Sequence, residues 1–246
     1  MTTILPIVQP SLLVGVPSAH RPPPPPGGEP QLWEVPPRAF APAARALADE
    51  VLDPAERERA ARIRHPEDRD VYVAAHVALR MLLGVQLGVD AGEVVLGRRP
   101  CPGCGDPHGR PYVSGDAVHF SLSYTRGRAL LAFAAVPVGV DIEPAPAPAT
   151  VVHVSSALHP RERAELAVLP KAERAAAFCR IWVRKEAYFK GLGIGLARGL
   201  QRDWLGADPA GSLQPDGWRI HDVEVGDGLS AAVAVAADTT ASDGGR

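Results

Sequence analysis

Apolar residues recur at helical spacing in four segments of the chain: 41–64, 66–88, 160–167 and 178–190. The first segment is expected to form two helices, with Asp53 as the N-cap of the second helix and Pro54 as its first residue. We expect the helix that starts after His65 to end at Gly84 or Gly88, because glycine favours helix C-termini.

A two-residue period indicates strands in the remaining ordered segments: 32–35, 118–124, 129–136, 138–144, 218–225 and 229–237. The last two flank the turn sequence GDG, so we expect a closing β-hairpin.

With 246 residues, the chain is large for one domain and small for two, so one compact unit or two closely packed halves are expected. The stretch PSAHRPPPPPGGEP cannot pack a core and is expected to be an extended or disordered lead-in. The expected organisation is a proline-rich lead-in at 1–30, an N-terminal half at 31–137, a C-terminal half at 138–237 and a flexible tail at 238–246.

Composition excludes several classes of protein. The net charge of −2 gives no general basic excess, so we expect no nucleic-acid partner. The first twenty residues lack a basic start and are interrupted by Pro6, Pro10 and Pro17, which argues against a signal peptide or a membrane span. Three cysteines without a secretory leader favour a reducing compartment, and we expect a cytoplasmic protein without a membrane partner.

The helix around 178–196 contains the first candidate chemistry, in the sequence FCRIWVRKEAYFKGLGIGL. Lys185 falls in the middle of an aromatic arc, where an ammonium is costly unless an anion receives it. Glu186 and Lys190 lie four residues apart beside that arc, and glycines at alternate positions stop the helix. A plain amphipathic core helix with an i,i+4 ion pair is the alternative interpretation.

The strand VGVDIEP contains the second candidate. Its period places Val138, Val140 and Ile142 on one face, and Asp141 and Glu143 on the other. Together with the glutamate of the helix, these two carboxylates would supply three oxygen ligands, a set that suits Mg²⁺ bridging to phosphates. A strand that runs into a solvated loop is the alternative, and it explains Glu143 better than Asp141.

The turn-rich segment RRPCPGCGDPHGRP raises two further possibilities. Cys101, Cys104 and His108 have the spacing of half a zinc site, with His119 or Cys179 as possible fourth ligands, and zinc binding is left open. The arginine of the following Gly-Arg-Pro sequence, held in a rigid loop, suits a phosphate.

At this point the motifs resemble those of a known family. The pair GVDIE (139–143) and WVRKEAYFKGLGIGL (182–196), about forty residues apart, resembles the 4′-phosphopantetheinyl transferase superfamily. HGRP (108–111) and HFSLSYTRG (119–127) are similar to upstream motifs of that family, in the same order. The resemblance covers roughly residues 50 to 200, and the chain length is similar to the longer type, which modifies carrier domains of nonribosomal peptide and polyketide synthases in secondary metabolism.

The resemblance implies an α+β fold, in which a monomer consists of two similar α/β halves related by a pseudo-twofold axis, with the active site and coenzyme A at their interface. It also implies transfer of the phosphopantetheine arm from coenzyme A to a serine of an apo acyl or peptidyl carrier protein, releasing adenosine 3′,5′-bisphosphate. Asp141, Glu143 and Glu186 would hold Mg²⁺ on the pyrophosphate. Glu186 would also take the serine proton, directly or through water, and Lys190 would neutralise or protonate the leaving phosphate. The residues expected to contact coenzyme A are Arg59, Arg80, Arg110, Pro111, Ser123, Tyr124, Asp141, Lys185 and Lys190.

Two positions depart from the family pattern. Tyr124 stands where family members usually have histidine, and a phenol brings no positive charge to a phosphate. Val71 and Tyr72 stand where a basic residue near the nucleotide is expected. Two other interpretations follow: a relative that binds coenzyme A or carrier protein without turnover, and a Mg²⁺ phosphohydrolase that would hydrolyse coenzyme A without a carrier.

Overall fold

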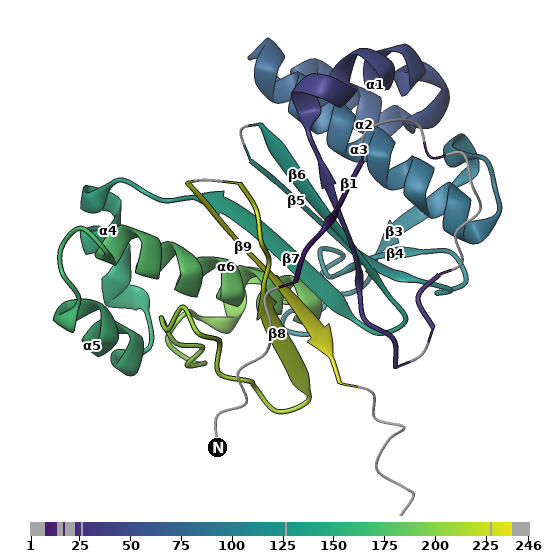
Figure 1. Ribbon diagram of the computed structural model, residues 1–246. Helices are drawn as coiled ribbons and strands as arrows, with labels where there is room; N and C mark the ends of the chain where they lie inside the picture. The colour runs from purple at the N-terminus through teal and green to yellow at the C-terminus, as the bar shows by residue number, and fades with distance from the viewer. Residues whose placement is uncertain are drawn as a thin grey trace, which may run out of the picture. The chain divides into compact units, whose positions relative to one another are not determined.

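A computed structural model describes residues 8–13, 17, 23–25, 27–125, 127–226 and 228–237. The described residues form six α-helices, three 3-10 helices and nine strands (Figure 1). The tail predicted at 238–246 and residues 18–22 of the proline-rich lead-in lie outside them. The predicted lead-in contains one element that the sequence pattern did not indicate, the short strand β1 (Ser11–Leu12).

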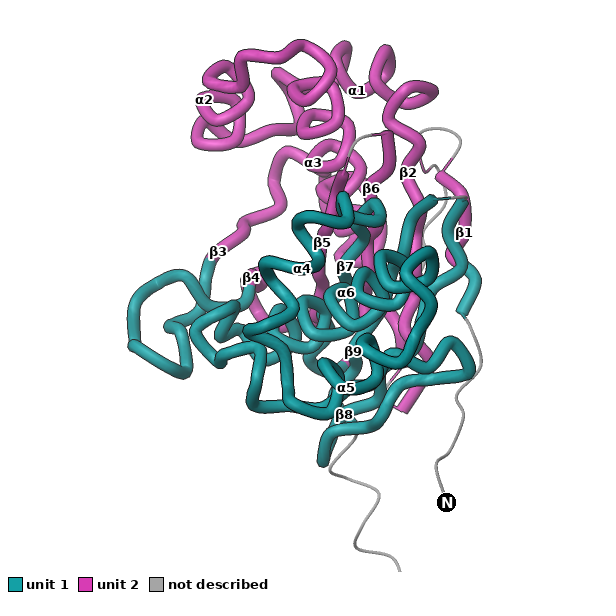
Figure 2. Tube along the Cα trace, turned by 90° about the vertical axis from the view of Figure 1, so that its left-hand side faces the viewer, with its two compact units in different colours: residues 1–9, 98–110, 136–246 teal, residues 10–97, 111–135 magenta. Residues whose placement is uncertain are grey.

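The chain divides into two compact units (Figure 2). Unit 1 comprises residues 1–9, 98–110 and 136–246, and unit 2 comprises residues 10–97 and 111–135. The main difference from the predicted boundary at 137/138 is the segment 98–110. It was expected in the N-terminal half, but it belongs to unit 1. The predicted pseudo-twofold relation between the halves stays a prediction.

Unit 2 combines a four-stranded sheet with a layer of helices. The strand order is β1-β2-β6-β5, with β1 parallel to β2 and the other pairs antiparallel. The remaining elements of this part of the chain are β2 (Gln31–Val35), α1 (Pro37–Val51), α2 (Pro54–Arg62), α3 (Pro66–Leu87), η1 (Ala91–Glu93), β3 (Leu96–Arg98), β4 (Pro111–Val113), β5 (His119–Thr125) and β6 (Arg128–Ala134). Asp53 and Glu56 form a capping box at the start of α2, which confirms the predicted N-cap.

Helix α3 is the core helix of unit 2. It packs against α1 and the sheet, and it ends at Gly88, whose φ of 70° is the left-handed conformation that glycine adopts readily. By length and composition alone this helix could cross a membrane, but 78% of its most apolar window is buried in the protein. Burial of this extent is what the core helix of a globular unit shows.

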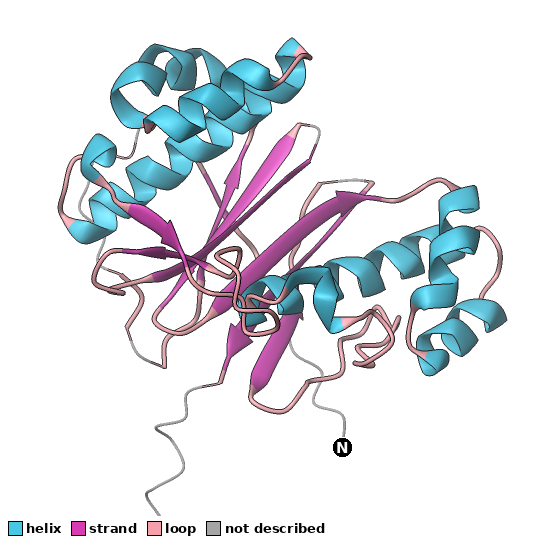
Figure 3. Cartoon of the chain, turned by 180° about the vertical axis from the view of Figure 1, so that it is seen from behind, coloured by secondary structure: helices cyan, strands magenta, loops and turns pink. Residues whose placement is uncertain are grey.

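Unit 1 packs one long helix onto a small antiparallel sheet with the order β7-β9-β8. The sheet contains the predicted closing hairpin. The elements of unit 1 are β7 (Val138–Pro144), α4 (Pro148–Val154), η2 (Ser155–Ala157), α5 (Pro160–Val168), α6 (Arg174–Leu192), η3 (Gly195–Arg198), β8 (Trp218–Asp222) and β9 (Leu229–Ala236). Helix α6 runs alongside the strands of its own unit (Figure 3).

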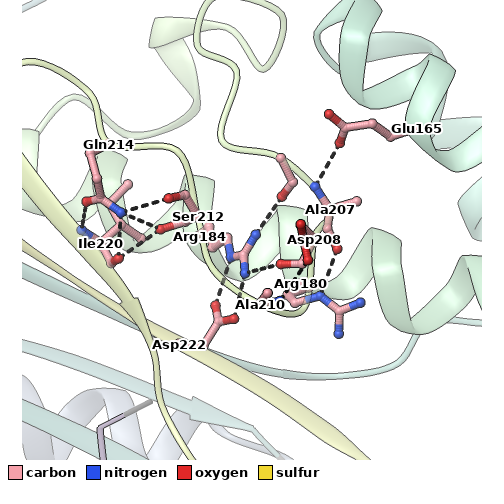
Figure 4. A network of polar contacts seen from close by, with 11 residues as sticks. Glu165, Arg180, Arg184, Ala207, Asp208, Ala210, Ser212, Gln214, Ile220 and Asp222 are labelled. Carbon is pink, nitrogen blue, oxygen red and sulfur yellow. Dashed lines mark hydrogen bonds and ion pairs between the residues drawn. The ribbon is translucent and has the colours of Figure 1, made fainter. Parts of the chain in front are cut away.

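A buried arginine fixes the rotation of α6 on the side away from the candidate site. Arg184 is fully buried, and its guanidinium donates to both carboxylate oxygens of Asp222 on β8, at 2.8 and 2.6 Å. It also donates to the carbonyl oxygens of Gly206 and Asp208, at 2.7 and 2.9 Å (Figure 4). Because Arg184 and Glu186 are about 200° apart around the helix, this network directs Glu186 toward β7.

Candidate functional site

The backbone of α6 approaches β7 unusually closely at Gly139. A Cβ atom on this residue would lie 2.0 Å from the carbonyl oxygen of Ala187 and 2.3 Å from the backbone nitrogen of Gly191. Gly139 alternates with Asp141 and Glu143 on one face of the strand, so that face is the one turned toward the helix. The absence of a side chain at this position therefore lets the strand carboxylates meet the charged side of α6.

An ion pair also joins β7 and α6. Nζ of Lys190 donates to Oδ1 of Asp141 at 2.7 Å and to the carbonyl oxygen of Val140 at 3.1 Å. Asp141 is 3% exposed, whereas the side chain of Lys190 keeps 32% of its surface exposed. The ammonium therefore lies at the rim of the site, where an incoming anion can reach it.

The site holds more negative than positive charge. Burial raises the pKa of Glu143 and of Glu186, and the neighbouring charge of Asp141 raises both further, while Lys190 lowers them. The three acids predicted from the sequence thus lie close enough to repel one another, with Lys190 to offset them, although their carboxylate oxygens do not all lie within 4.8 Å of one another. Three oxygen donors with excess negative charge suit a hard divalent cation.

The segment 98–110 ends beside the C-terminus of α6. Gly193, whose φ is 76°, caps the helix, and a Cβ on it would lie 2.9 Å from the backbone nitrogen and from Cγ of Arg110. Arg110 therefore lies beside Gly193, which follows Lys190 by three residues, and it belongs to unit 1. Pro111 begins β4 and belongs to unit 2.

Unit 2 gathers other predicted residues around an aromatic cluster formed by Tyr72, His76 and Tyr124. The rings of Tyr72 and His76 stack with centroids 3.9 Å apart, and the ring of Tyr124 meets them edge-on at 6.2 and 5.9 Å. The exposed Arg59 places its guanidinium carbon 5.9 Å from the centroid of Tyr72, and Ser123 is buried next to the cluster's third ring. The predicted residues Arg59 and Tyr124 therefore share one neighbourhood.

The aromatic cluster is uncharged at neutral pH. Burial lowers the pKa of His76 to about 4 and raises the pKa of Tyr72 to about 12. Nδ1 of His76 lies 2.9 Å from the carbonyl oxygen of Tyr72, so the histidine is a satisfied member of the helix α3 surface. Arg59 and the buried Arg80 are the cations that act on His76.

Arg80 does not lie where a nucleotide could reach it. Its side chain is 1% exposed, with Nε 2.5 Å from Glu56, Nη2 2.6 Å from Asp53 and Nη1 2.8 Å from the carbonyl oxygen of Val94. The guanidinium joins the start of α2 to α3. The prediction that Arg80 contacts coenzyme A is therefore not supported by the structure.

Lys185 is likewise enclosed. Its ammonium lies 3.0 Å from Oε2 of Glu162, both side chains are fully buried, and it also donates to the carbonyl oxygen of Asp203. The anion that the aromatic arc requires is thus a protein carboxylate rather than a pyrophosphate. The predicted contact of Lys185 with coenzyme A is not supported either.

The sequence pattern missed two features of these sites. Glu162 belongs to a capping box with His159 and also accepts a hydrogen bond from the backbone N–H of Leu205. Because a capping glutamate is usually at the surface, its position in the sequence did not predict a buried ion pair. The stacking of Tyr72 on His76 follows from their spacing of four residues on α3, and this spacing in the sequence could have predicted the contact.

Comparisons with known proteins agree with the motif resemblance. A family model described as the 4′-phosphopantetheinyl transferase superfamily matches residues 137–223, which include β7, α6 and the four charged residues between them. The 4′-phosphopantetheinyl transferase HetI of Nostoc sp. is 30% identical over 217 residues, covering 85% of this chain and 88% of that protein.

Two further relatives show the same family. The 4′-phosphopantetheinyl transferase Sfp of Bacillus subtilis is 26% identical over 148 residues, covering 59% of this chain and 62% of that protein. A putative 4′-phosphopantetheinyl transferase of Synechocystis sp., slr0495, is 26% identical over 180 residues, covering 71% and 69%. With these matches and the acid–lysine site on β7 and α6, the chain belongs to the 4′-phosphopantetheinyl transferase superfamily.

Proposed function

We propose that this protein transfers the 4′-phosphopantetheine arm of coenzyme A to a serine hydroxyl of an apo acyl or peptidyl carrier protein and releases adenosine 3′,5′-bisphosphate. The observation that carries this proposal is the meeting of Asp141, Glu143, Glu186 and Lys190 between one strand and one helix, in a chain of this superfamily. The reaction moves a phosphoryl group, so positioning and charge neutralisation supply most of the rate.

The three carboxylates would hold Mg²⁺, because their oxygen donors carry excess negative charge in a half-buried site. When bound, the ion supplies positive charge to the pyrophosphate of coenzyme A. Glu186 takes the proton of the carrier serine, directly or through water, which is the role that the motif resemblance gives it. Lys190, at the rim of the site, neutralises the departing phosphate.

The nucleotide part of coenzyme A needs cations and stacking surfaces. From the motif resemblance we assign these contacts to Arg110 in unit 1, and to Arg59, Pro111, Ser123 and Tyr124 in unit 2. Arg80 and Lys185 are left out because both side chains are buried in ion pairs.

The setting of the reaction is proposed from the composition and the motif resemblance. The protein acts as a monomer in the cytoplasm, on carrier domains of peptide or polyketide synthases in secondary metabolism.

The test is intact-protein mass spectrometry of apo carrier proteins incubated with this protein, coenzyme A and Mg²⁺. We expect each accepted carrier to gain the mass of one phosphopantetheine, and adenosine 3′,5′-bisphosphate to appear in equal amount. A parallel reaction with EDTA should show no gain.

Two outcomes would overturn the proposal. Binding of coenzyme A without a gain on any carrier would indicate a relative that does not turn over. Release of the bisphosphate without a carrier, with water as the acceptor, would indicate a phosphohydrolase.

A further inference from the structure

The segment 98–110 contains a cluster of metal-binding side chains that the proposed transfer does not use. The ligand atoms of Cys101, Cys104 and His108 all lie within 4.8 Å of one another, and no other group of three or more such ligands meets this limit among the described residues. Sγ of Cys104 is 3.0 Å from Nε2 of His108. This cluster lies in unit 1, outside the acid–lysine site.

The spacing of these atoms is close to that of a zinc site. Zn–S bonds of about 2.3 Å and Zn–N bonds of about 2.0–2.1 Å in a tetrahedron place neighbouring ligand atoms about 3.5–3.8 Å apart. Atoms 3.0 Å apart, within a group that spans at most 4.8 Å, reach these distances by shifts of a fraction of an ångström to about one ångström. The ligands therefore already converge on one point.

The backbone of the loop holds the ligands in this arrangement. The N–H of Cys101 donates to the carbonyl oxygen of Asp106 at 2.7 Å, and the N–H of His108 donates to the same oxygen at 2.8 Å. The N–H of Gly103 donates to Sγ of Cys101 at 3.4 Å, a contact that favours a thiolate. Gly105 closes the turn with a φ of 81°, in the left-handed region that a glycine adopts without strain.

Neither of the two fourth ligands considered from the sequence is among the three residues of this cluster. The thiol of Cys179 is buried against β7 and donates to the carbonyl oxygens of Glu143 and Pro144 at 3.6 and 3.5 Å. His119 is the first residue of β5 in unit 2. Oδ2 of Asp106 is 3.5 Å from Sγ of Cys104, but the carboxylate does not lie within 4.8 Å of all three ligand atoms.

We propose that this loop binds one Zn²⁺ through Cys101, Cys104 and His108, with the fourth position taken by a solvent molecule. Two thiolates and an imidazole are the ligands that zinc prefers over the hard cations suited to three carboxylates. Binding displaces the two thiol protons to the solvent.

The zinc site is structural and stabilises the packing of the loop on α6. A Cβ on Gly103 would lie 3.2 Å from the side chain of Ile194, and the segment ends at Arg110 beside the helix cap. The thirteen residues 98–110 contribute little apolar surface, so a metal supplies the cross-link that a hydrophobic core does not. In terms of the proposed transfer, on which this consequence rests, the metal would hold Arg110 in place for the nucleotide.

The test is the zinc content of the full-length protein, purified under a thiol-free reductant, supplied with Zn²⁺ and freed of excess metal by gel filtration. We expect about one zinc per wild-type chain, and below about 0.1 per chain in Cys104→Ser and His108→Ala. Both side chains are exposed, so these substitutions leave the fold intact. Cys179→Ala and His153→Ala, a thiol and a histidine outside the cluster, should keep the full amount.

Cobalt provides a second readout that does not depend on activity. Co²⁺ in place of Zn²⁺ should give thiolate charge-transfer bands and the strong visible bands of a tetrahedral site, which Cys104→Ser should weaken. Less than about 0.1 zinc per reduced wild-type chain would overturn the proposal and leave a Cys101–Cys104 disulfide as the use of this pair. Retention of zinc by Cys104→Ser and His108→Ala together would also overturn it. Neither result bears on whether a carrier protein is modified.

Discussion

Substitution of Gly139 by alanine should separate the two halves of the acid–lysine site. The new Cβ would lie 2.0 Å from the carbonyl oxygen of Ala187 and 2.3 Å from the backbone nitrogen of Gly191, where ordinary contacts begin at 3.4 Å. Both clashing atoms belong to the helix backbone, so no side-chain rotation relieves them. Helix α6 must therefore move away from β7 by about 1.4 Å, or the strand must bend by as much.

The expected magnitudes follow from this displacement. Overpacking of this kind costs about 1–3 kcal/mol of folding free energy. For a chain of this size the melting temperature falls by about 2–4 °C for each kcal/mol. Because a misplacement of about 1 Å lowers a positioned reaction by about 100-fold, we expect kcat for carrier modification to fall by at least that factor.

The assay combines thermal unfolding with steady-state carrier modification, and Gly103→Ala is the matched control. A Cβ on Gly103 would meet only side-chain atoms, those of Ile194 at 3.2 Å and Sγ of Cys101 at 3.7 Å, so a shift of a few tenths of an ångström relieves it and its melting temperature and rate should change far less than those of Gly139→Ala. A Gly139→Ala protein with wild-type rate and melting temperature would refute the close packing of α6 on β7.

Three further substitutions test the charged residues. In Glu186→Gln, loss of the base should lower the rate by about 10²–10⁴-fold. The variant should also melt above the wild type at pH 8, because the folded state raises the pKa of Glu186, and the wild type therefore loses stability as the pH rises through the folded-state pKa. The difference in melting temperature between the two proteins should vanish below pH 4.5, where Glu186 is protonated in both the folded and the unfolded state. A melting temperature equal to the wild type's at pH 8 would contradict this. Lys185→Ala leaves Glu162 buried without its cation and should cost about 3–5 kcal/mol in denaturant unfolding at pH 7; a loss below about 1 kcal/mol would show that the pair is not buried. Arg80→Ala should cost a similar amount, while the KM for coenzyme A of the remaining folded enzyme stays unchanged; a large rise in KM would return Arg80 to the nucleotide contacts.

Local patterns in the sequence predicted the elements of the site. The alternation along VGVDIEP identified the face of β7 that carries Asp141 and Glu143, and the four-residue spacing placed Glu186 beside Lys190 on α6. Both features depend only on the period of a strand or helix. They do not depend on what the element packs against.

Features that depend on distant partners could not be predicted in this way. The buried ion pair of Lys185 and Glu162 joins α6 to α5. The loop between these helices has no periodic pattern that would predict how they pack. The segment 98–110 likewise shows only turn signals, and nothing in them indicates that it packs with unit 1. The strand β1 has two residues, which is too short for any period to appear.

The central claim is that the acids of β7 and α6 carry out the transfer to the carrier serine. Its most direct test is a single-turnover reaction of wild type, Glu186→Gln and Glu173→Gln with coenzyme A, Mg²⁺ and an accepted apo carrier, followed by intact mass. Glu173 is an exposed glutamate at the start of the same helix and serves as the control. The account predicts full conversion by the wild type and Glu173→Gln and a rate lower by about 10²-fold or more in Glu186→Gln. Equal rates for all three proteins would contradict it.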